Sequence, residues 1–130
     1  MSDSLSKIYQ LRFSGQEEYR NAIWQILVRD FFSKWIKKDS VVLDLGCGYG
    51  EFINNVLDCE RHAMDLNPDT RDSLEKNVTF HEQDCSQAWP LKSDSIDLIF
   101  TSNFFEHLPN KESLDKTVAH IKTALRPGGL

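Results

Sequence analysis

The stretch VVLDLGCGYGEF, residues 41–52, joins a short apolar run to a turn that contains three glycines. Its first part, Val41–Leu45, is almost wholly apolar, as in a strand that is covered on both faces of a parallel sheet. Gly46, Gly48 and Gly50 then bring bare main chain close to a ligand, because no Cβ blocks the approach and a positive φ costs glycine little. The stretch therefore predicts a nucleotide or nucleoside site at the end of a buried strand.

Two acidic residues beside this turn indicate which ligand fits. Dinucleotide-binding folds use the spacing G-x-G-x-x-G and hold a pyrophosphate at the helix N-terminus. Here Glu51 occupies the position of the third glycine, and Asp44 precedes the turn. A pyrophosphate would meet two carboxylates at close range. A ligand with an ammonium and a sulfonium is attracted instead, and S-adenosylmethionine carries both groups.

Strand and helix patterns alternate along the chain, which is typical of a parallel α/β sheet. Further strands are expected at residues 62–66, 78–80 and 96–101, and helices at residues 17–38, after Gly50, from Asn67-Pro68 to about residue 76, and from Asn110 to the stop at Pro127-Gly128-Gly129. We expect the first helix to bury the apolar stripe Ile23, Ile26, Leu27, Phe31, Trp35 and Ile36, and the last helix to bury Leu114, Val118, Ile121 and Leu125. The fold predicted is an α/β, Rossmann-like three-layer sandwich with a mostly parallel sheet.

Two more acids stand at or just after the carboxyl ends of predicted strands, at the sheet edge where open α/β folds bind ligands. Asp65 comes 21 residues after Asp44, and its carboxylate can accept hydrogen bonds from both ribose hydroxyls. Asp84 follows the third strand and can accept from an adenine amino group, with Cys85 and Trp89 beside the ring. Together with the glycine turn, these acids predict a site for a cationic nucleoside.

Four segments in order, VVLDLGCGYGEF, AMDLNPD, EQDCSQAWPLKSDSIDLIFTSNFFEHL and LRPGGL, resemble a class I S-adenosylmethionine-dependent methyltransferase over residues 41–130. The resemblance implies that Asp44 and Gly46 face the methionine part of the cofactor, Asp65 the ribose, Asp84 and Cys85 the adenine, and Ser102 and Asn103 the transferred methyl group. The full set of expected cofactor residues is Asp44, Gly46, Cys47, Gly48, Gly50, Asp65, Leu66, Asp84, Cys85, Ser102 and Asn103.

The predicted activity is methyl transfer to an unidentified small-molecule acceptor. Such a displacement mainly requires the acceptor to be held about 3–3.5 Å from the methyl carbon, in line with the sulfur. Two other functions stay open. A nicotinamide-dependent oxidoreductase uses a similar fold, although Asp44 and Glu51 disfavour its cofactor, and a non-catalytic module would bind S-adenosylmethionine without transferring its methyl group.

His107 and Glu106 are the candidate catalytic pair. An alcohol or phenol acceptor must lose a proton, and imidazole titrates near neutral pH, with Glu106 able to orient the ring. In the simpler alternative, Glu106 faces the N-terminal dipole of the next helix and His107 is packed or solvated. Some ubiquinone-pathway O-methyltransferases bind a metal through an acid-x-x-Glu-His motif, but Asn103 stands where that acid belongs, so no metal site is predicted.

The chain is expected to form an N-terminal arm and helix over residues 1–40 and a cofactor-binding domain over residues 41–130. Tyr9, Arg12, Phe13 and Tyr19 either form part of a loose arm or fold over the cofactor, with Arg12 or Arg20 on its carboxylate. The family domain normally continues with further strands, so we expect a truncated sheet and a bare edge at residues 96–101, covered in the whole protein or by a second copy.

Composition excludes several function classes. A formal charge of −5 gives no global field for nucleic acid, and no apolar run approaches the roughly 20 residues of a membrane span. Residues 1–10 also lack the layout of a secretory signal, so the expected location is the cytoplasm. Cys47, Cys59 and Cys85 are far apart and are expected to be reduced packing residues.

Overall fold

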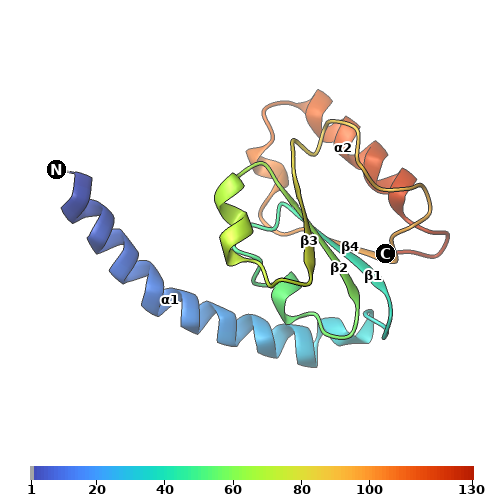
Figure 1. Cartoon of the computed structure of the whole chain (residues 1–130). Helices are drawn as coiled ribbons and strands as arrows, with labels where there is room; N and C mark the ends of the chain where they lie inside the picture. The colour runs from blue at the N-terminus through green and yellow to red at the C-terminus, as the bar shows by residue number, and fades with distance from the viewer. Residues whose placement is uncertain (1) are drawn as a thin grey trace.

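The computed structural model describes the main chain of residues 2–130 and the side chains of residues 15–130. Its centre is a four-stranded sheet in the order β3-β2-β1-β4, and every neighbouring pair is parallel (Figure 1). The strands are β1 (Val41–Leu45), β2 (Glu60–Asp65), β3 (Val78–Glu82) and β4 (Leu98–Phe100). The predicted parallel α/β sheet is confirmed. The second and third strands differ from the predicted ranges by one or two residues at an end, and the fourth is shorter than expected.

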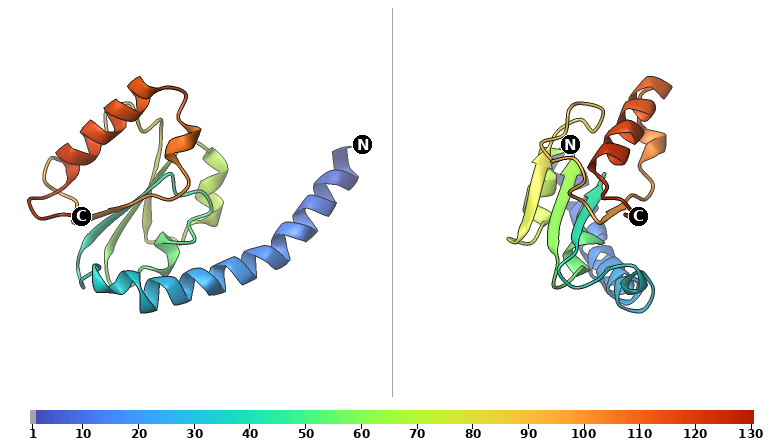
Figure 2. Two further views of the ribbon diagram at one scale, coloured as in Figure 1. Left: turned by 180° about the vertical axis from the view of Figure 1, so that it is seen from behind. Right: turned by 90° about the vertical axis from the view of Figure 1, so that its right-hand side faces the viewer.

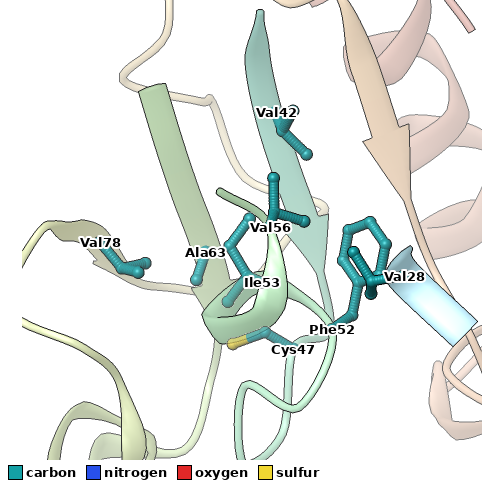
Figure 3. Close-up of a cluster of buried hydrophobic side chains, with 8 residues drawn as sticks. All are labelled: Val28, Val42, Cys47, Phe52, Ile53, Val56, Ala63 and Val78. Carbon is teal, nitrogen blue, oxygen red and sulfur yellow. The ribbon is translucent and has the colours of Figure 1, made fainter. Parts of the chain in front are cut away.

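This sheet is the middle one of three layers, with helices on each of its faces (Figure 2). The helix α2 (Lys111–Ala124) covers one face, where Leu43, Leu45 and Met64 are fully buried. The helix α1 (Ser2–Asp30) and the short 3-10 helix η2 (Ile53–Asn55) lie on the other. Figure 3 shows the cluster on that second face: Val28, Val42, Cys47, Phe52, Ile53, Val56, Ala63 and Val78.

The alternation of side chains along β1 positions the site. Val42 belongs to the α1-side cluster and Leu43 to the α2-side cluster, so Asp44 points to the α1 side at the carboxyl end of the strand. Its neighbours in register are Ala63 on β2 and Phe100 on β4. Asp44 thus places a carboxyl group near the end of an apolar strand in the middle of the sheet, and the residue is only 3% exposed.

The first helix differs from its predicted range of 17–38. It begins at Ser2 and ends at Asp30, and a 3-10 helix, η1 (Phe32–Lys34), follows it. The Ser33 hydroxyl donates to the Arg29 carbonyl at 2.6 Å, and such a local bond competes with continuation of the helix. Within the described chain, no helix is long and apolar enough to cross a membrane.

The apolar stripe expected in the core is largely exposed. Ile26, Phe31 and Trp35 are 51%, 46% and 45% exposed. The residues that pack toward the sheet are Trp24 and Val28 on α1, Phe32 on η1, and Ile36 just after η1. The prediction was wrong because α1 rests on one side of the domain along a single narrow face, and neighbouring helical positions are turned away by about 100°. Its N-terminal half projects from the domain (Figure 1).

Two predicted helices are short 3-10 segments. The one after Gly50 is η2, and the one expected to reach residue 76 is η3 (Pro68–Ser73), whose Asn67 cap is confirmed by a 3.0 Å bond from the Asp69 amide. The last helix ends before Leu125, and its cap is confirmed by a 2.8 Å bond from the Ser113 amide to the Asn110 side chain. However, Thr117 is fully buried on α2 while Val118 is 47% exposed, which corrects the predicted stripe.

The edge of β4 is partly covered by the chain itself. The Ile99 amide donates to the Leu130 carbonyl at 2.8 Å, and the Leu130 amide donates to the Asp97 carbonyl at 3.0 Å. β4 is nevertheless the outermost named strand, with β1 on its other side. The expectation of a bare edge along residues 96–101 therefore needs correction, since Leu130 satisfies part of it.

Candidate cofactor site

The glycine turn folds as predicted, with positive φ angles of 69°, 54° and 75° at Gly46, Gly48 and Gly50. The amides of Gly46 and Cys47 both donate to the Met64 carbonyl, at 2.8 and 3.2 Å, which ties the turn to the end of β2. Because the turn has so little side chain, space remains on both sides of it. Two cavities open there.

The first cavity has a volume of about 350 Å³ and lies on the α1 side of the turn. Asp44 and Glu51 give it two carboxylates, and Arg20, whose Nε lies 3.0 Å from Glu51 Oε1, adds one positive charge. Its apolar wall consists of Phe52 and Phe100, whose rings stack with centroids 3.8 Å apart, and of Trp24, which meets Phe100 edge-on at 5.7 Å. The first cavity is therefore an acidic hollow with an aromatic wall, and both features favour a cation.

The second cavity, of about 500 Å³, lies on the other side of Gly46 and Gly48. Asp65 lines it, and each of its oxygens accepts one main-chain bond, from Gly48 at 3.0 Å and from Asn67 at 2.9 Å. Each carboxylate oxygen can accept a second hydrogen bond, so a ligand in this cavity still has acceptors available.

Asp84 also lines the second cavity. Hydrogen bonds from the main chain and then from the hydroxyl of Ser86, at 2.9 and 2.8 Å, lower the pKa of Asp84. Both bonds fall on Oδ1, and the carboxylate stays ionised at neutral pH as an acceptor for a ligand donor.

Burial raises the pKa of Asp44 to about 7. A main-chain hydrogen bond from Ile53 opposes this rise, while the carboxylates of Asp65 and Glu51 add to it. Burial also raises the pKa of the Cys47 thiol, with further contributions from Asp44 and Asp65, so Cys47 is protonated and is a poor nucleophile. A cation in the first cavity would favour the ionised form of Asp44.

We expect the free energy of unfolding of the ligand-free chain to fall by about 1 kcal/mol between pH 6 and pH 8 through Asp44 alone. Its pKa is about 7 in the folded chain, against about 4 in an unfolded one. The folded state therefore binds more protons over this interval, and its added stability is lost as pH rises through 7. Urea unfolding at both pH values measures the change.

An Asp44→Asn variant is the control, because its neutral amide has no proton to lose. Its free energy of unfolding should lack this part of the pH dependence. Equal slopes in the wild type and the variant would contradict the prediction.

The structure gathers most of the expected cofactor residues around the two cavities, and Gly46, Gly48 and Asn103 line both. The first cavity is also lined by Asp44, Cys47 and Ser102, and the second is also lined by Asp65, Leu66, Asp84 and Cys85. Gly50 lines neither cavity; a Cβ there would lie 2.5 Å from Leu74 Cδ2, so this glycine closes the turn against its neighbour.

The candidate catalytic pair follows β4 on a 3-10 helix, η4 (Phe105–His107). The His107 side chain is 73% exposed and lines the second cavity, as Asp84 does, and it does not line the first cavity, to which Ser102 belongs. Glu106 Oε1 lies 3.8 Å from His107 Nε2 and lines neither cavity. Trp89 also lies outside both, because its indole N–H donates to the Cys85 carbonyl at 2.8 Å.

Arg20 was expected either in a loose arm or on the carboxylate of the cofactor, and it lines the first cavity from α1. Other residues around the site were missed by sequence reasoning. Trp24 also reaches the first cavity from α1, and no spacing in the sequence relates that helix to the glycine turn. Phe104 packs under Gly46 and lines the second cavity. Phe100 was detectable, since it lies on the same strand face as Asp44 once the parallel register is known. Tyr9, Arg12 and Phe13 lie outside the described side chains.

Residues 15–130 contain no candidate metal site, and their three cysteines are not paired. In that part of the chain no three His, Cys, Asp or Glu side chains are arranged to hold a metal ion. Cys47, Cys59 and Cys85 are free thiols, and Cys85 Sγ lies 3.3 Å from the Thr117 hydroxyl inside the core.

Comparison with known proteins identifies the family. A family model described as a methyltransferase domain matches residues 16–130. An uncharacterized methyltransferase of Mycobacteroides abscessus is 26% identical over 144 aligned residues, which cover 99% of this chain and 54% of the relative. The chain therefore spans about half the length of that relative.

Two crystal structures show the same fold. A TehB-like S-adenosylmethionine-dependent methyltransferase from Corynebacterium glutamicum matches with a TM-score of 0.72 and 18% identity, over 98% of this chain and 71% of that one. The PH0226 protein from Pyrococcus horikoshii matches with a TM-score of 0.71 and 25% identity, over 86% and 55%. The chain belongs to the methyltransferase domain family and has the Rossmann-like fold of S-adenosylmethionine-dependent methyltransferases, as its sequence motifs implied.

Proposed function

We propose that this chain binds S-adenosylmethionine across the two cavities and is the cofactor-binding part of a methyltransferase that acts on a small-molecule acceptor. The observation that carries the proposal is the pair of cavities on either side of Gly46 and Gly48, one acidic and aromatic, the other lined by Asp65 and Asp84. A ligand with a cationic amino-acid end and a nucleoside end matches that arrangement.

The second cavity fits the adenosine half. Asp65 has acceptor capacity left after its two main-chain bonds, which suits the paired hydroxyls of a ribose. Asp84 is held ionised by Ser86 and suits the amino group of adenine. Leu66 and Cys85 offer apolar contact to the base, and their cavity of about 500 Å³ has room for it.

The first cavity fits the methionine half. Asp44 and Glu51 disfavour a pyrophosphate and favour a cationic ligand, and the rings of Phe52, Phe100 and Trp24 form an aromatic wall beside which a sulfonium would lie. This charge pattern also argues against a nicotinamide dinucleotide, the cofactor of the rival oxidoreductase function.

Catalysis in this proposal rests mainly on positioning. S-adenosylmethionine, when bound, supplies an electrophilic methyl group. Ser102 and Asn103 lie at the end of β4 on the wall of the first cavity, and we assign them to the space near the acceptor. His107, with Glu106 beside it, is the proposed base for an acceptor that must lose a proton. Because His107 lines the second cavity, such an acceptor would reach it past Asn103, which lines both cavities.

Isothermal titration calorimetry with S-adenosylmethionine and S-adenosylhomocysteine tests the proposal, with reduced nicotinamide adenine dinucleotide as the competing ligand. Micromolar binding of the first two and none of the third is expected. Binding of the dinucleotide alone would favour the oxidoreductase. Failure of a folded chain to bind any of the three would contradict the proposed function.

A further inference from the structure

A row of large apolar side chains lies on a side of α1 that does not face the sheet. These side chains recur every three or four residues, so neighbours in the row are one helical turn apart. The row continues past the end of α1, because the Phe31 amide still donates to the Leu27 carbonyl at 3.0 Å. We call this row the outer face of α1, and its members, each between 38% and 68% exposed, are Tyr19, Ile23, Ile26, Leu27, Phe31 and Trp35.

The outer face is a continuous patch rather than a set of isolated side chains. The rings of Phe31 and Trp35 meet edge-on with centroids 5.1 Å apart, and Ile23 and Leu27 occupy successive turns before them. Single exposed apolar residues are normal on a protein surface, whereas a contiguous apolar patch marks a binding surface. None of the six residues lines either cavity of the candidate cofactor site. The outer face therefore has no part in that site.

The helix also extends beyond its own domain. Its 29 residues have a length of about 44 Å at 1.5 Å per residue. Figures 1 and 2 show that the N-terminal half projects away from the sheet and the other helices. Most of the stability of a helix in a protein comes from packing against another element. A long helix with an apolar outer face is therefore suited to pack against a second molecule.

The charges along the outer face favour a second copy of this chain. Glu17 and Glu18 lie at the N-terminal end of the face, and Lys34, Lys37 and Lys38 lie at its C-terminal end, all of them exposed. A copy that runs antiparallel brings its lysines to these acids, and the same attraction is repeated at the other end. A parallel copy would bring like charges together, which opposes association.

We propose that the outer face of α1 is the interface of a homodimer, in which the α1 helices of two copies pack antiparallel. In a two-fold dimer the same patch meets itself, so residue i of one copy contacts residue j of the other and the reverse. An axis near Leu27 brings Tyr19 to Trp35 and Ile23 to Phe31. This pairing buries the whole row against an identical row, and it does not depend on the proposed function.

An anionic membrane is the competing occupant of the outer face. Helices that lie in a membrane surface combine an apolar face with lysines and arginines along its borders. Here the cations are confined to one end, Glu17 and Glu18 occupy the other, and the chain has a formal charge of −5. Acids and a negative net charge oppose binding to anionic lipid. The charge pattern therefore favours a second copy.

Sedimentation velocity of the whole chain from about 1 to 100 µM measures the association, and a dimer with a dissociation constant in the micromolar range or below is expected. Ile26→Glu should raise this constant about a hundredfold or more, because two carboxylates would be buried close to the two-fold axis. Val118→Glu is the matched control, since Val118 is 47% exposed on α2 and Ile26 is 51% exposed on α1. It should leave the dimer unchanged.

Charge reversal tests the antiparallel direction. At low salt, Glu17→Lys/Glu18→Lys should weaken the dimer about three- to tenfold, because lysines then face Lys37 and Lys38 of the other copy. Adding Lys37→Glu/Lys38→Glu to the same chain restores opposite charges at both ends and should recover the affinity of the wild type. Circular dichroism of each variant checks that the helices are retained.

Each other outcome overturns the inference. A chain that stays monomeric up to about 100 µM does not form this dimer. A dimer that Ile26→Glu leaves intact uses another surface, such as the edge of β4. A reversed chain that gains no affinity from the second pair of changes contradicts the antiparallel direction. A monomer that sediments with vesicles of phosphatidylserine, and loses this binding in Ile26→Glu, would assign the outer face to a membrane surface instead.

Discussion

Asp65→Ala is expected to weaken binding of S-adenosylhomocysteine roughly a hundredfold or more, because the variant loses two charge-assisted hydrogen bonds to the ribose, each worth about 1.5–3 kcal/mol. Asp65 lies at the end of β2, and its oxygens already accept from Gly48 and Asn67. The same carboxylate thus shapes the glycine turn and faces the second cavity. Calorimetry on a variant whose fold has been checked by circular dichroism measures the loss.

A ligand comparison separates these two roles. An analogue of 5′-methylthioadenosine without the 2′ and 3′ hydroxyls should bind the wild type much more weakly than 5′-methylthioadenosine does, and should bind Asp65→Ala about as well as 5′-methylthioadenosine does. Asp69→Ala, which removes an exposed acid four residues away, is the control and should bind normally. If Asp65→Ala binds within about threefold of the wild type, the ribose assignment is wrong.

Gly46→Ala is expected to lower the free energy of unfolding by roughly 3–5 kcal/mol, since it combines backbone strain with a clash. The φ angle of Gly46 is 69°, a region that residues with a Cβ rarely adopt. An alanine Cβ there would lie 2.9 Å from Cβ of Phe104 and closer still to its ring. Phe104 packs into the α2-side cluster, so it has little freedom to move.

Gly48→Ala is the matched control for this prediction. Its φ angle is 54°, but no atom lies within 4 Å of the added Cβ, so only the strain remains, at about 1–2 kcal/mol. Urea unfolding of both variants gives the comparison. Equal losses would contradict the role of Phe104. If Gly46→Ala does not fold, Gly46→Ala/Phe104→Ala should fold better than the single variant, because the clash has been removed.

The local pattern of the sequence was sufficient to predict the sheet and the glycine turn. An apolar run followed by Gly46, Gly48 and Gly50 predicts a buried strand and a tight turn, because alternation, burial and positive φ are properties of neighbouring residues. The acids at the carboxyl ends of the strands were also predictable. Parallel strands bring their carboxyl ends to one edge, so Asp44, Asp65 and Asp84 meet around the turn although up to 40 residues of sequence separate them.

The helices were predicted less well, since apolar periodicity says that a helix has a buried face without saying how wide that face is. In α1, Trp24 and Val28 face the sheet and Ile26 does not. In α2, the core takes Thr117, whose hydroxyl donates to the Ser113 carbonyl at 2.7 Å, and leaves Val118 exposed. The hydroxyl is satisfied within its own helix, which allows a polar residue to replace an apolar one.

By itself, then, the sequence determined the parallel α/β sheet, the glycine turn, the acids at the carboxyl ends of the strands and the methyltransferase family. The tertiary structure decided which other residues line the site around those acids. It divided the site into two cavities, brought Arg20 and Trp24 from α1 against Glu51 and Phe100, and set Phe104 under Gly46. The physical reason is that these contacts depend on the packing of whole elements across the sheet, which no local spacing encodes.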